Sequence, residues 1–342
     1  MKKKISYDDH IFIAGSSGMA GGAIKRKLEK NGYGYQKNGG LILTPTRKDL
    51  DLLNFLEVEN WFKKNKPTVV IIAAAKVGGI SANSSLPADF ILNNLKIQTN
   101  LIELSWKYNV KRLLFLGSSC IYPKYAKQPL KEDYLLDGPL EPTNQWYAVA
   151  KIAGIKLCES LRIQHNFDAI TLMPTNLYGP GDNYHHENSH VMAALIKRFY
   201  NASINKDKVV TCWGTGKPLR EFMHVDDLGD AVVFALENWD PNSENAPKNE
   251  QGGKLSFLNV GTGTDISIKN LAEKIALACN FKGQIEWDKN KPDGTPKKQL
   301  NVTNFNKLGW LPKIELDEGI RKTIEDYKLE QNKKIIRNNF IN

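Results

Sequence analysis

The fold of this chain is decided by the stretch Gly117-Ser118-Ser119-Cys120-Ile121-Tyr122-Pro123. It follows residues 112–116, a short apolar run that is typical of a buried parallel strand. The hydroxyl and thiol groups of the stretch therefore emerge at the carboxyl end of a strand, where open α/β sheets bind their ligands. Further along, Tyr147 and Lys151 stand four positions apart among good helix formers, so the phenol and the ammonium group share one helix face. A cation in that position favours ionisation of the phenol.

The pairing of a strand-end serine with Tyr-x-x-x-Lys resembles the short-chain dehydrogenase/reductase superfamily, in its extended branch that modifies nucleotide sugars. Three longer runs narrow the resemblance to the GDP-L-fucose synthase family: LGSSCIYP at 116–123, AKIAGIKLCES at 150–160 and MPTNLYGP at 173–180. Similar runs extend over nearly the whole chain. Tyr-x-x-x-Lys alone is a weak signal, because any amphipathic helix can show it by chance, but the full set is specific.

The composition is that of a soluble globular protein. A chain of 342 residues with 41% hydrophobic residues can fill a sizeable core. No apolar run approaches the roughly 18 residues that a membrane span needs, and the lysine-rich start leads into a mostly polar segment rather than a signal sequence. The four cysteines lie far apart without Cys-x-x-Cys spacing, which favours reduced thiols. We therefore expect a cytoplasmic protein that does not enter a membrane.

The formal charge of +10 raises the question of nucleic-acid binding. The lysines are scattered among Asp and Glu and form no dense basic block, so we predict no nucleic-acid partner. A solvated lysine-rich surface is the simplest interpretation. A second interpretation is that the positive charge attracts anionic nucleotides.

Apolar runs separated by helical segments predict an α/β fold with a Rossmann-type doubly wound parallel sheet and a smaller C-terminal α/β substrate domain. The strands of the main sheet are expected at 11–14, 41–44, 69–73, 112–116, 169–173 and 257–260. From residue 179 the chain becomes polar and rich in Gly and Pro, which suggests a change of domain. We assign 1–178 and 222–262 to an NADP-binding domain, 179–221 and 263–330 to a nucleotide-sugar domain, and 331–342 to a frayed polar tail.

The glycine-rich turn at 15–21 lies between the first strand and a helix that runs to about residue 30. Glycines there permit a tight turn, close approach of pyrophosphate to backbone N–H groups and close packing of helix on strand. With Tyr147 and Lys151 downstream, this turn predicts dinucleotide binding. Pattern and resemblance together give the following cofactor contacts: Gly15, Ser16, Ser17, Gly18, Met19, Gly21, Arg47, Leu116, Gly117, Lys151, Pro174, Thr175, Asn176 and Leu177.

The end of the second strand indicates which dinucleotide binds. An acidic residue there would hold the free ribose 2′-hydroxyl of NAD, but this chain has Pro45-Thr46-Arg47-Lys48. Positive charge suits a 2′-phosphate, so NADP (NADPH) is favoured over NAD. Some family members carry further arginines where this chain has Ser17 and Pro45, which leaves Arg47 as the main candidate.

The resemblance assigns the catalytic roles. Ser118 and Tyr147 would hydrogen-bond the C4 oxygen of the substrate, Lys151 would hold the cofactor ribose and lower the pKa of the tyrosine, and His190 would be the general acid in epimerisation. Cys120 would be the base that removes protons from C3 and C5. A lone cysteine beside a strand is more often a small core residue, and the resemblance reverses this interpretation. If the chain stays extended, Cys120 faces the same side as Ser118.

Residues 186–190 read His-Glu-Asn-Ser-His, which matches the zinc-protease pattern His-Glu-x-x-His. That pattern needs a helix, whereas this one follows a Gly- and Pro-rich loop and lacks an obvious third ligand, so we predict no metal. His190 alone is then the meaningful residue.

Substrate contacts follow from the resemblance as well. The positions that match the family are Arg198, Trp213, Arg220, Asp293 and Lys298. Either arginine could equally be a solvated surface charge.

The resemblance thus implies a bifunctional enzyme. It would epimerise C3 and C5 of GDP-4-keto-6-deoxy-D-mannose and reduce C4 with NADPH to give GDP-L-fucose, acting as a homodimer. One alternative is a reductase or epimerase for another GDP-4-keto-6-deoxy sugar, such as a heptose. A second is a dinucleotide-sensing protein without catalysis, against which the intact Ser118, Tyr147 and Lys151 argue.

Overall fold

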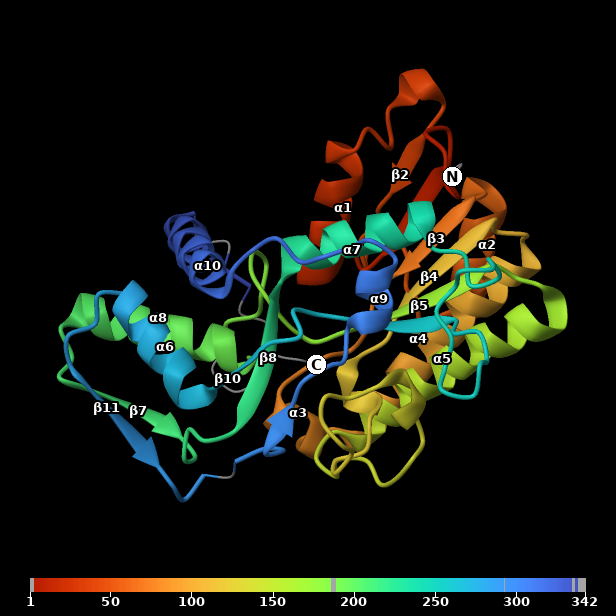
Figure 1. The fold of residues 1–342 in the computed structure, drawn as a ribbon. Coiled ribbons are helices and arrows are strands. Elements are labelled where there is room, and N and C mark those ends of the chain that lie inside the picture. Colours follow the sequence, from red (N-terminus) through yellow and green to blue (C-terminus); the bar gives the residue numbers. More distant parts are fainter. Residues whose placement is uncertain (1–2, 186–188, 292, 334–335, 338–342) are drawn as a thin grey trace.

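The computed structural model describes residues 3–185, 189–291, 293–333 and 336–337. Its centre is a six-stranded, wholly parallel sheet with the strand order β2-β1-β3-β4-β5-β9 (Figure 1). The strands are β1 (His10–Ala14), β2 (Leu41–Leu43), β3 (Val69–Ile72), β4 (Arg112–Leu116), β5 (Ala169–Pro174) and β9 (Phe257–Val260). This order changes direction between β1 and β3, as in a doubly wound sheet, so the predicted fold class is confirmed.

Helices cover both faces of this sheet (Figure 1). On one face lie α1 (Met19–Lys30) and α7 (Val225–Asn238), which pack against each other. On the other lie α2 (Phe55–Asn65), α4 (Pro87–Lys107) and α5 (Gln145–His165). The inner strands β3, β4 and β5 are therefore buried along their full length, which explains their continuous apolar runs.

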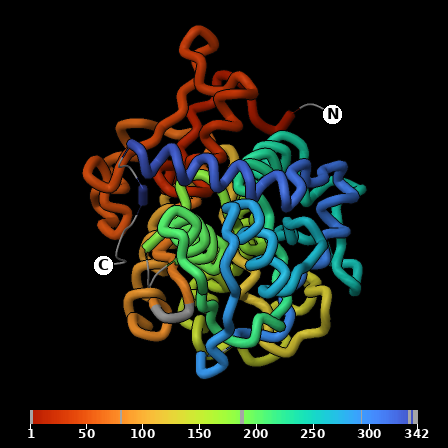
Figure 2. Tube along the Cα trace, turned by 90° about the vertical axis from the view of Figure 1, so that its left-hand side faces the viewer, coloured from red at the N-terminus to blue at the C-terminus, as the bar shows by residue number. Residues whose placement is uncertain are grey.

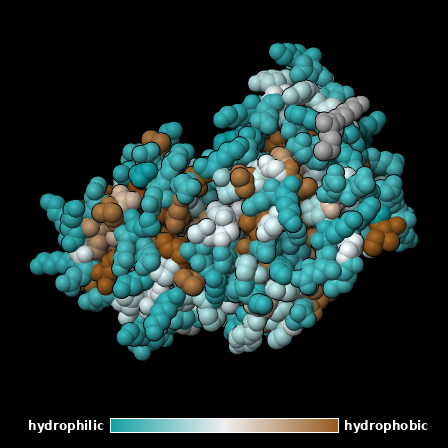
Figure 3. Space-filling model, in the orientation of Figure 1, coloured by the Kyte–Doolittle hydropathy of each residue, from teal (hydrophilic) through white to brown (hydrophobic). Residues whose placement is uncertain are grey.

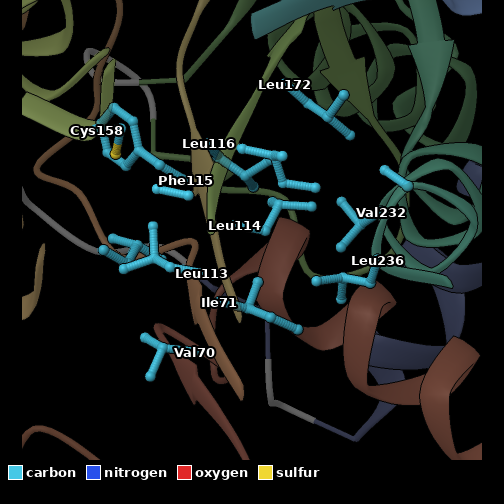
Figure 4. Close-up of a cluster of buried hydrophobic side chains, with 14 of the residues drawn as sticks. Val70, Ile71, Leu113, Leu114, Phe115, Leu116, Cys158, Leu172, Val232 and Leu236 are labelled. Atoms are coloured by element: carbon cyan, nitrogen blue, oxygen red, sulfur yellow. The ribbon is translucent and has the colours of Figure 1, made fainter. Parts of the chain in front are cut away.

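The alternation of side chains along β4 shows how the two faces are filled. Figure 4 shows Phe115 on the side of Cys158, which comes from α5, and Leu114 on the side of Val232, which comes from α7. Successive side chains of a strand point to opposite faces, so one five-residue strand packs on both helical layers. This double anchoring fixes the position of residues 117–120, which follow β4 directly.

A second lobe carries its own sheets and its own hydrophobic core. One sheet contains β6 (Asn176–Tyr178), β8 (Leu219–His224), β10 (Asp265–Ser267) and β12 (Lys297–Lys298), and the other pairs β7 (Val209–Trp213) with β11 (Gln284–Asp288). Its helices are α6 (Val191–Asn205), α8 (Ile268–Ala278) and α10 (Leu316–Asn332). The remaining short elements are α3 (Ile80–Ser85), α9 (Thr303–Lys307), η1 (Gln36–Asn38), η2 (Ser119–Ile121) and η3 (Glu132–Tyr134).

The element boundaries differ from the predicted domain division in two places. Strand β8 crosses the expected boundary at residue 222 and lies in the second lobe's sheet. Helix α10 continues to Asn332, two residues into the segment expected to be a frayed tail. The domain division as a whole stays a prediction.

The face shown in Figure 3 is mostly hydrophilic, with hydrophobic residues in small groups. This agrees with the many lysines of the sequence. Among the described residues, no helix is both long enough and apolar enough to cross a membrane.

Candidate active site at the carboxyl edge of the main sheet

The glycine-rich turn lies directly after β1 and is shaped by two close backbone contacts. Gly15 has φ +87°, and a Cβ there would lie 2.6 Å from the backbone nitrogen of Ala74. A Cβ at Gly21 would lie 2.2 Å from the carbonyl oxygen of Gly15. Any other residue at either position would collide with backbone, so both glycines are required by packing.

The same turn leaves the start of α1 open to an anion. Gly18 is the N-cap residue of α1, and among the described residues no side chain caps this helix end. The first turn carries no acidic residue. The N–H groups at the helix start and the positive end of the helix dipole thus face the turn formed with Ser16, Ser17 and Met19. This arrangement fits the pyrophosphate of a dinucleotide.

Arg47 follows β2, the strand that pairs with β1. Its side chain is exposed in a turn held by Thr46, whose backbone nitrogen and hydroxyl both donate to Asp49, at 2.9 and 2.7 Å. Arg47 and the glycine-rich turn therefore lie at one edge of the sheet. Its placement fits a contact with the 2′-phosphate that distinguishes NADP from NAD.

The predicted nicotinamide end is built from β4, β5 and β6. Leu116 ends β4, the backbone nitrogen of Gly117 donates to Leu172 of β5 at 2.9 Å, and Pro174 ends β5. Thr175 and Asn176 then donate through their side chains to the carbonyl oxygen of Glu221, at 3.2 and 2.8 Å, and Leu177 continues in β6. These bonds tie the loop after β5 to β8 of the second lobe.

The chain does not stay extended after Ser118, so that expectation was wrong. Ser118 is the N-cap residue of η2, and its Oγ accepts a hydrogen bond from the backbone nitrogen of Cys120 at 3.4 Å. A serine side chain that bonds to nearby backbone in this way starts a helical turn instead of continuing a strand. Cys120 is buried in this 3₁₀ turn.

Lys151 lies beneath the same turn, where it is buried and donates through Nζ to the carbonyl oxygen of Leu116 at 2.8 Å. Its Nζ stands 4.6 Å from the ring centroid of Phe115 and 5.7 Å from that of Tyr147. Burial lowers the pKa of Lys151 to about 8, and the charge of a thiolate at Cys120 opposes this.

Burial raises the pKa of Tyr147, the negative charge of Cys120 adds to the rise, and a hydrogen bond with Ser118 opposes it. The expectation that Lys151 would lower the pKa of this tyrosine is therefore not met, because desolvation is the largest influence on the pKa and raises it. The phenol is protonated at neutral pH. The interactions nevertheless bring Ser118, Cys120, Tyr147 and Lys151 into one cluster, as the sequence predicted.

His190 and Lys298 come from the second lobe. His190 is the N-cap residue of α6, and Lys298 ends β12 beside Arg220 of β8. His190 is exposed as a residue, but desolvation of its imidazole by surrounding protein atoms and the charge of Lys298 lower its pKa. Burial lowers the pKa of Lys298, which the charge of Cys120 opposes. Lys298 thus links the second lobe to the Cys120 cluster.

The remaining predicted substrate residues form two groups. Burial lowers the pKa of Arg220, and the negative charge of Asp293 opposes this by raising the pKa. Asp293 is in turn oriented by Thr215, which donates to it from backbone and hydroxyl at 2.9 and 2.6 Å. Trp213 is exposed at the end of β7, and Lys291 Nζ lies 5.3 Å from its ring centroid. These residues combine positive charge with an exposed aromatic ring, so together they can hold an anionic ligand that carries an aromatic nucleobase.

Arg198 is placed differently. Its Nη1 donates to the carbonyl oxygen of Thr211 at 2.6 Å, which directs this side chain from α6 to strand β7. A substrate contact at Arg198 stays a prediction.

Two further residues could not be found from the sequence. Glu141 acts electrostatically on both Arg220 and Lys298, and it accepts a bond from Lys124 at 2.9 Å. Thr215 orients Asp293. Both lie in loops whose local pattern carries no signal, because tertiary contacts alone give them their partners.

Among the residues that the structure describes, no three His, Cys, Asp or Glu side chains could hold a metal ion. His186 and Glu187 of the His-Glu-x-x-His pattern lie outside these residues.

The chain is similar to known proteins in sequence and in fold. The pattern of the NAD dependent epimerase/dehydratase family matches residues 11–247. The chain belongs to this family. Within it, GDP-L-fucose synthase 1 of Arabidopsis thaliana is 50% identical over 317 residues, covering 93% of this chain and 92% of that protein. GDP-L-fucose synthase of Escherichia coli is 48% identical over 319 residues, covering 92% and 95%. The resemblance to this group of the family is therefore confirmed.

Two solved structures match nearly the whole chain. A GDP-6-OMe-4-keto-L-xylo-heptose reductase from C. jejuni has a TM-score of 0.87 and 35% identity, covering 95% of this chain and 99% of that one. A GDP-L-fucose synthetase from Naegleria fowleri bound to NADP has a TM-score of 0.83 and 26% identity, covering 97% of each. The site described above therefore belongs to a family fold that is known with this cofactor bound.

Proposed function

We propose that this chain is a GDP-L-fucose synthase, which epimerises C3 and C5 of GDP-4-keto-6-deoxy-D-mannose and reduces C4 with NADPH. The observation that carries the proposal is the single cluster of Ser118, Cys120, Tyr147 and Lys151, with Lys298 beside it. It joins a hydrogen-bonding pair for a ketone oxygen to a thiol for proton abstraction. The identities near 50% with proteins named GDP-L-fucose synthase support the same substrate.

NADPH fits the residues of the sheet edge. The uncapped start of α1 would hold the pyrophosphate, Arg47 the 2′-phosphate, and Lys151 the ribose. When bound, the cofactor supplies the hydride for C4. The burial of Lys151 against Leu116 and Phe115 holds its ammonium group in place before the cofactor arrives.

In epimerisation, Ser118 and Tyr147 donate hydrogen bonds to the C4 oxygen and stabilise the enolate that forms when a neighbouring carbon loses its proton. Cys120 takes that proton, and His190 returns one to the opposite face. The lowered pKa of His190 keeps its imidazole neutral in the free protein. The anionic diphosphate of the substrate would offset Lys298 and so favour the protonated form that a general acid needs.

In reduction, Tyr147 donates its phenolic proton to the developing alkoxide at C4. Its raised pKa keeps this proton available at neutral pH. Once the proton has left, Ser118 stabilises the phenolate through its hydrogen bond, and the ammonium group of Lys151 lies 5.7 Å from the ring centroid.

The test of this function is incubation of the purified protein with GDP-4-keto-6-deoxy-D-mannose and NADPH, followed by NADPH absorbance and NMR identification of the sugar. We expect GDP-L-fucose. A reduced product that retains the configuration of the substrate at C3 and C5 would show a C4 reductase and no epimerase. A GDP-4-keto-heptose assayed in parallel tests the alternative substrate, which the 35% identity to the heptose reductase favours less.

NADPH should be preferred over NADH because Arg47 is the cation at the end of β2. A charge-assisted contact is worth roughly 1.5–3 kcal/mol, so Arg47→Ala should lower kcat/KM for NADPH by about tenfold or more and leave that for NADH nearly unchanged. Lys30→Ala, at the far end of α1, is the matched control. Equal use of both cofactors by the wild type would overturn the preference.

We propose a homodimer formed through α4 and α5, which pack side by side. Their outer faces leave Leu92, Trp106, Val149 and Ile163 exposed. Exposed apolar residues on adjacent helices are typical of a self-association surface.

Ile163 is 80% exposed, so Ile163→Asp should leave the protomer folded but convert the dimer to a monomer of about half the mass in light scattering. Leu277→Asp, 75% exposed on α8 of the other lobe, is the control and should remain dimeric. A dimeric Ile163→Asp protein would place the interface elsewhere.

We also propose that the enzyme acts in the cytoplasm. All four cysteines are free and buried, which suits a reducing compartment. Cell fractionation with an antibody to the chain tests this.

A further inference from the structure

The chain that follows α10 returns to the glycine-rich turn. In Figure 2, α10 crosses the molecule in dark blue and ends beside the red and orange N-terminal segments. Beyond it, Nη1 of Arg337 lies 3.7 Å from the position that a Cβ at Gly18 would occupy. Residues more than three hundred positions apart in the sequence are thus brought together at the start of α1.

The backbone of Arg337 is anchored on the second lobe. Its carbonyl oxygen accepts a hydrogen bond from the backbone nitrogen of Tyr184 at 2.9 Å, and the neighbouring Ile336 packs against the second hydrophobic core. Tyr184 is itself buried, and its ring centroid lies 4.5 Å from that of Tyr327 in α10. The approach of the guanidinium group to Gly18 therefore follows from a fixed backbone.

The charges at the start of α1 favour the binding of an anion. The guanidinium group faces the positive end of the α1 dipole, which no side chain among the described residues caps. Two carboxyl groups lie near this point. Asp182 is buried and already accepts a bond from the backbone nitrogen of Asn183 at 2.7 Å. Glu330 of α10 accepts a bond from the backbone of Gly181, and burial raises its pKa. Burial raises the pKa of Asp182 to about 7, against the charge of Arg337, so this carboxyl group is only partly ionised at neutral pH.

We propose that Arg337 binds the pyrophosphate of the cofactor, and that the C-terminal segment thereby supplies the cation that Ser16 and Ser17 do not provide in the turn itself. The proposal rests on the proposed NADPH cofactor. A guanidinium group can bridge two phosphate oxygens through its planar fork, as the backbone N–H groups of the helix start approach others. The 2′-phosphate is the other anionic group of NADPH, and Arg47 is positioned for it at the end of β2.

The proposal is tested by calorimetric binding of NADPH and of NADH to the full chain without sugar substrate. Arg337→Gln should weaken both nucleotides by the same factor, about tenfold, because both carry the pyrophosphate. The affinity of the variant for either nucleotide should also fall less steeply with salt concentration than that of the wild type, because one charged contact with phosphate is lost. Arg47→Ala should weaken NADPH alone, and Arg321→Gln, an exposed arginine on α10, should change neither.

Three outcomes would overturn the assignment. Wild-type affinity of Arg337→Gln for both nucleotides would show that Arg337 binds neither phosphate group. A loss confined to NADPH would assign Arg337 to the 2′-phosphate instead. Failure of the wild type to bind NADPH would overturn the proposed cofactor together with the role of Arg337. This outcome is distinct from the first, in which the wild type binds NADPH and the variant binds it equally well. Should Arg337→Gln fold poorly, Arg337→Lys keeps the charge without the planar fork, and its affinity for both nucleotides should be intermediate.

Discussion

Replacing Tyr147 by phenylalanine should lower the rate of C4 reduction by about 10²–10⁴-fold, the range that general acid catalysis contributes. The substitution removes only the phenolic oxygen. The ring keeps its edge-on contact with Phe90, at 6.5 Å between centroids, and Lys151 keeps its bond to Leu116. NADPH binding should therefore stay within about twofold of the wild type, because the variant retains every residue assigned to the cofactor.

Single-turnover measurement of NADPH oxidation separates the chemical step from binding and product release. Tyr125→Phe is the matched control, since Tyr125 is 78% exposed on a loop and should behave as the wild type. If Tyr147→Phe kept most of the reduction rate, another group would supply the proton and the assignment of Tyr147 as general acid would be wrong.

The electrostatics of the site agree with a proton donor at Tyr147. Desolvation raises the pKa of Tyr147, while Ser118 lowers it through a hydrogen bond. Lys151, with a pKa of about 8, remains largely charged at neutral pH. The phenol is thus protonated before the reaction, and Ser118 already forms a hydrogen bond with it. The sequence pattern placed these groups together but could not give the balance between burial and charge.

The sheet was predictable because its inner strands are buried on both faces. Runs such as 69–72 and 113–116 are wholly apolar, which no surface helix or loop would be. Strands β10 and β12 of the second lobe were not predicted, because two or three residues are too short to show a period. Their pairing with β8 is fixed by tertiary contacts.

The residues of the candidate site also fall into a group that the sequence predicted and a group that it did not. Tyr147 and Lys151 were predictable from a helical spacing within one segment, and the glycine-rich turn from its place after β1. The 3₁₀ turn at Cys120 was missed, because the bond that the backbone nitrogen of Cys120 donates to Ser118 Oγ decides it and the sequence there resembles a strand. Arg337 carried no sequence signal at all, since its approach to Gly18 depends on how α10 crosses the molecule.

Replacing Cys120 by alanine should separate the two activities of the enzyme. In deuterated solvent, the wild type should exchange the C3 and C5 hydrogens of the keto-sugar without NADPH, because the ketone makes them acidic and the base needs no hydride. Cys120→Ala should slow this exchange by about 10²–10⁴-fold. The variant should still reduce the unepimerised ketone slowly, because Ser118, Tyr147 and Lys151 remain.

The position of Cys120 supports a base that is distinct from the groups holding the ketone. In a 3₁₀ turn the chain rises only about 2 Å per residue, so Cys120 stays close to Ser118 instead of moving away along a strand. Cys120 acts electrostatically on Tyr147 and Lys151, and also on Lys298 of the second lobe. Cys120 therefore lies within electrostatic range of the ammonium groups of Lys151 and Lys298.

NMR of the recovered sugar measures the exchange at each carbon, and Cys212→Ala is the control, a buried thiol in β7 of the second lobe that should not alter it. Exchange at the wild-type rate in Cys120→Ala would mean that Cys120 is not the base, and the epimerase half of the proposed function would fail. If the wild type itself shows no exchange but reduces a sugar that has been epimerised beforehand, the cluster acts on the ketone oxygen alone, and the chain is a C4 reductase in which Cys120 only fills the turn after Ser118.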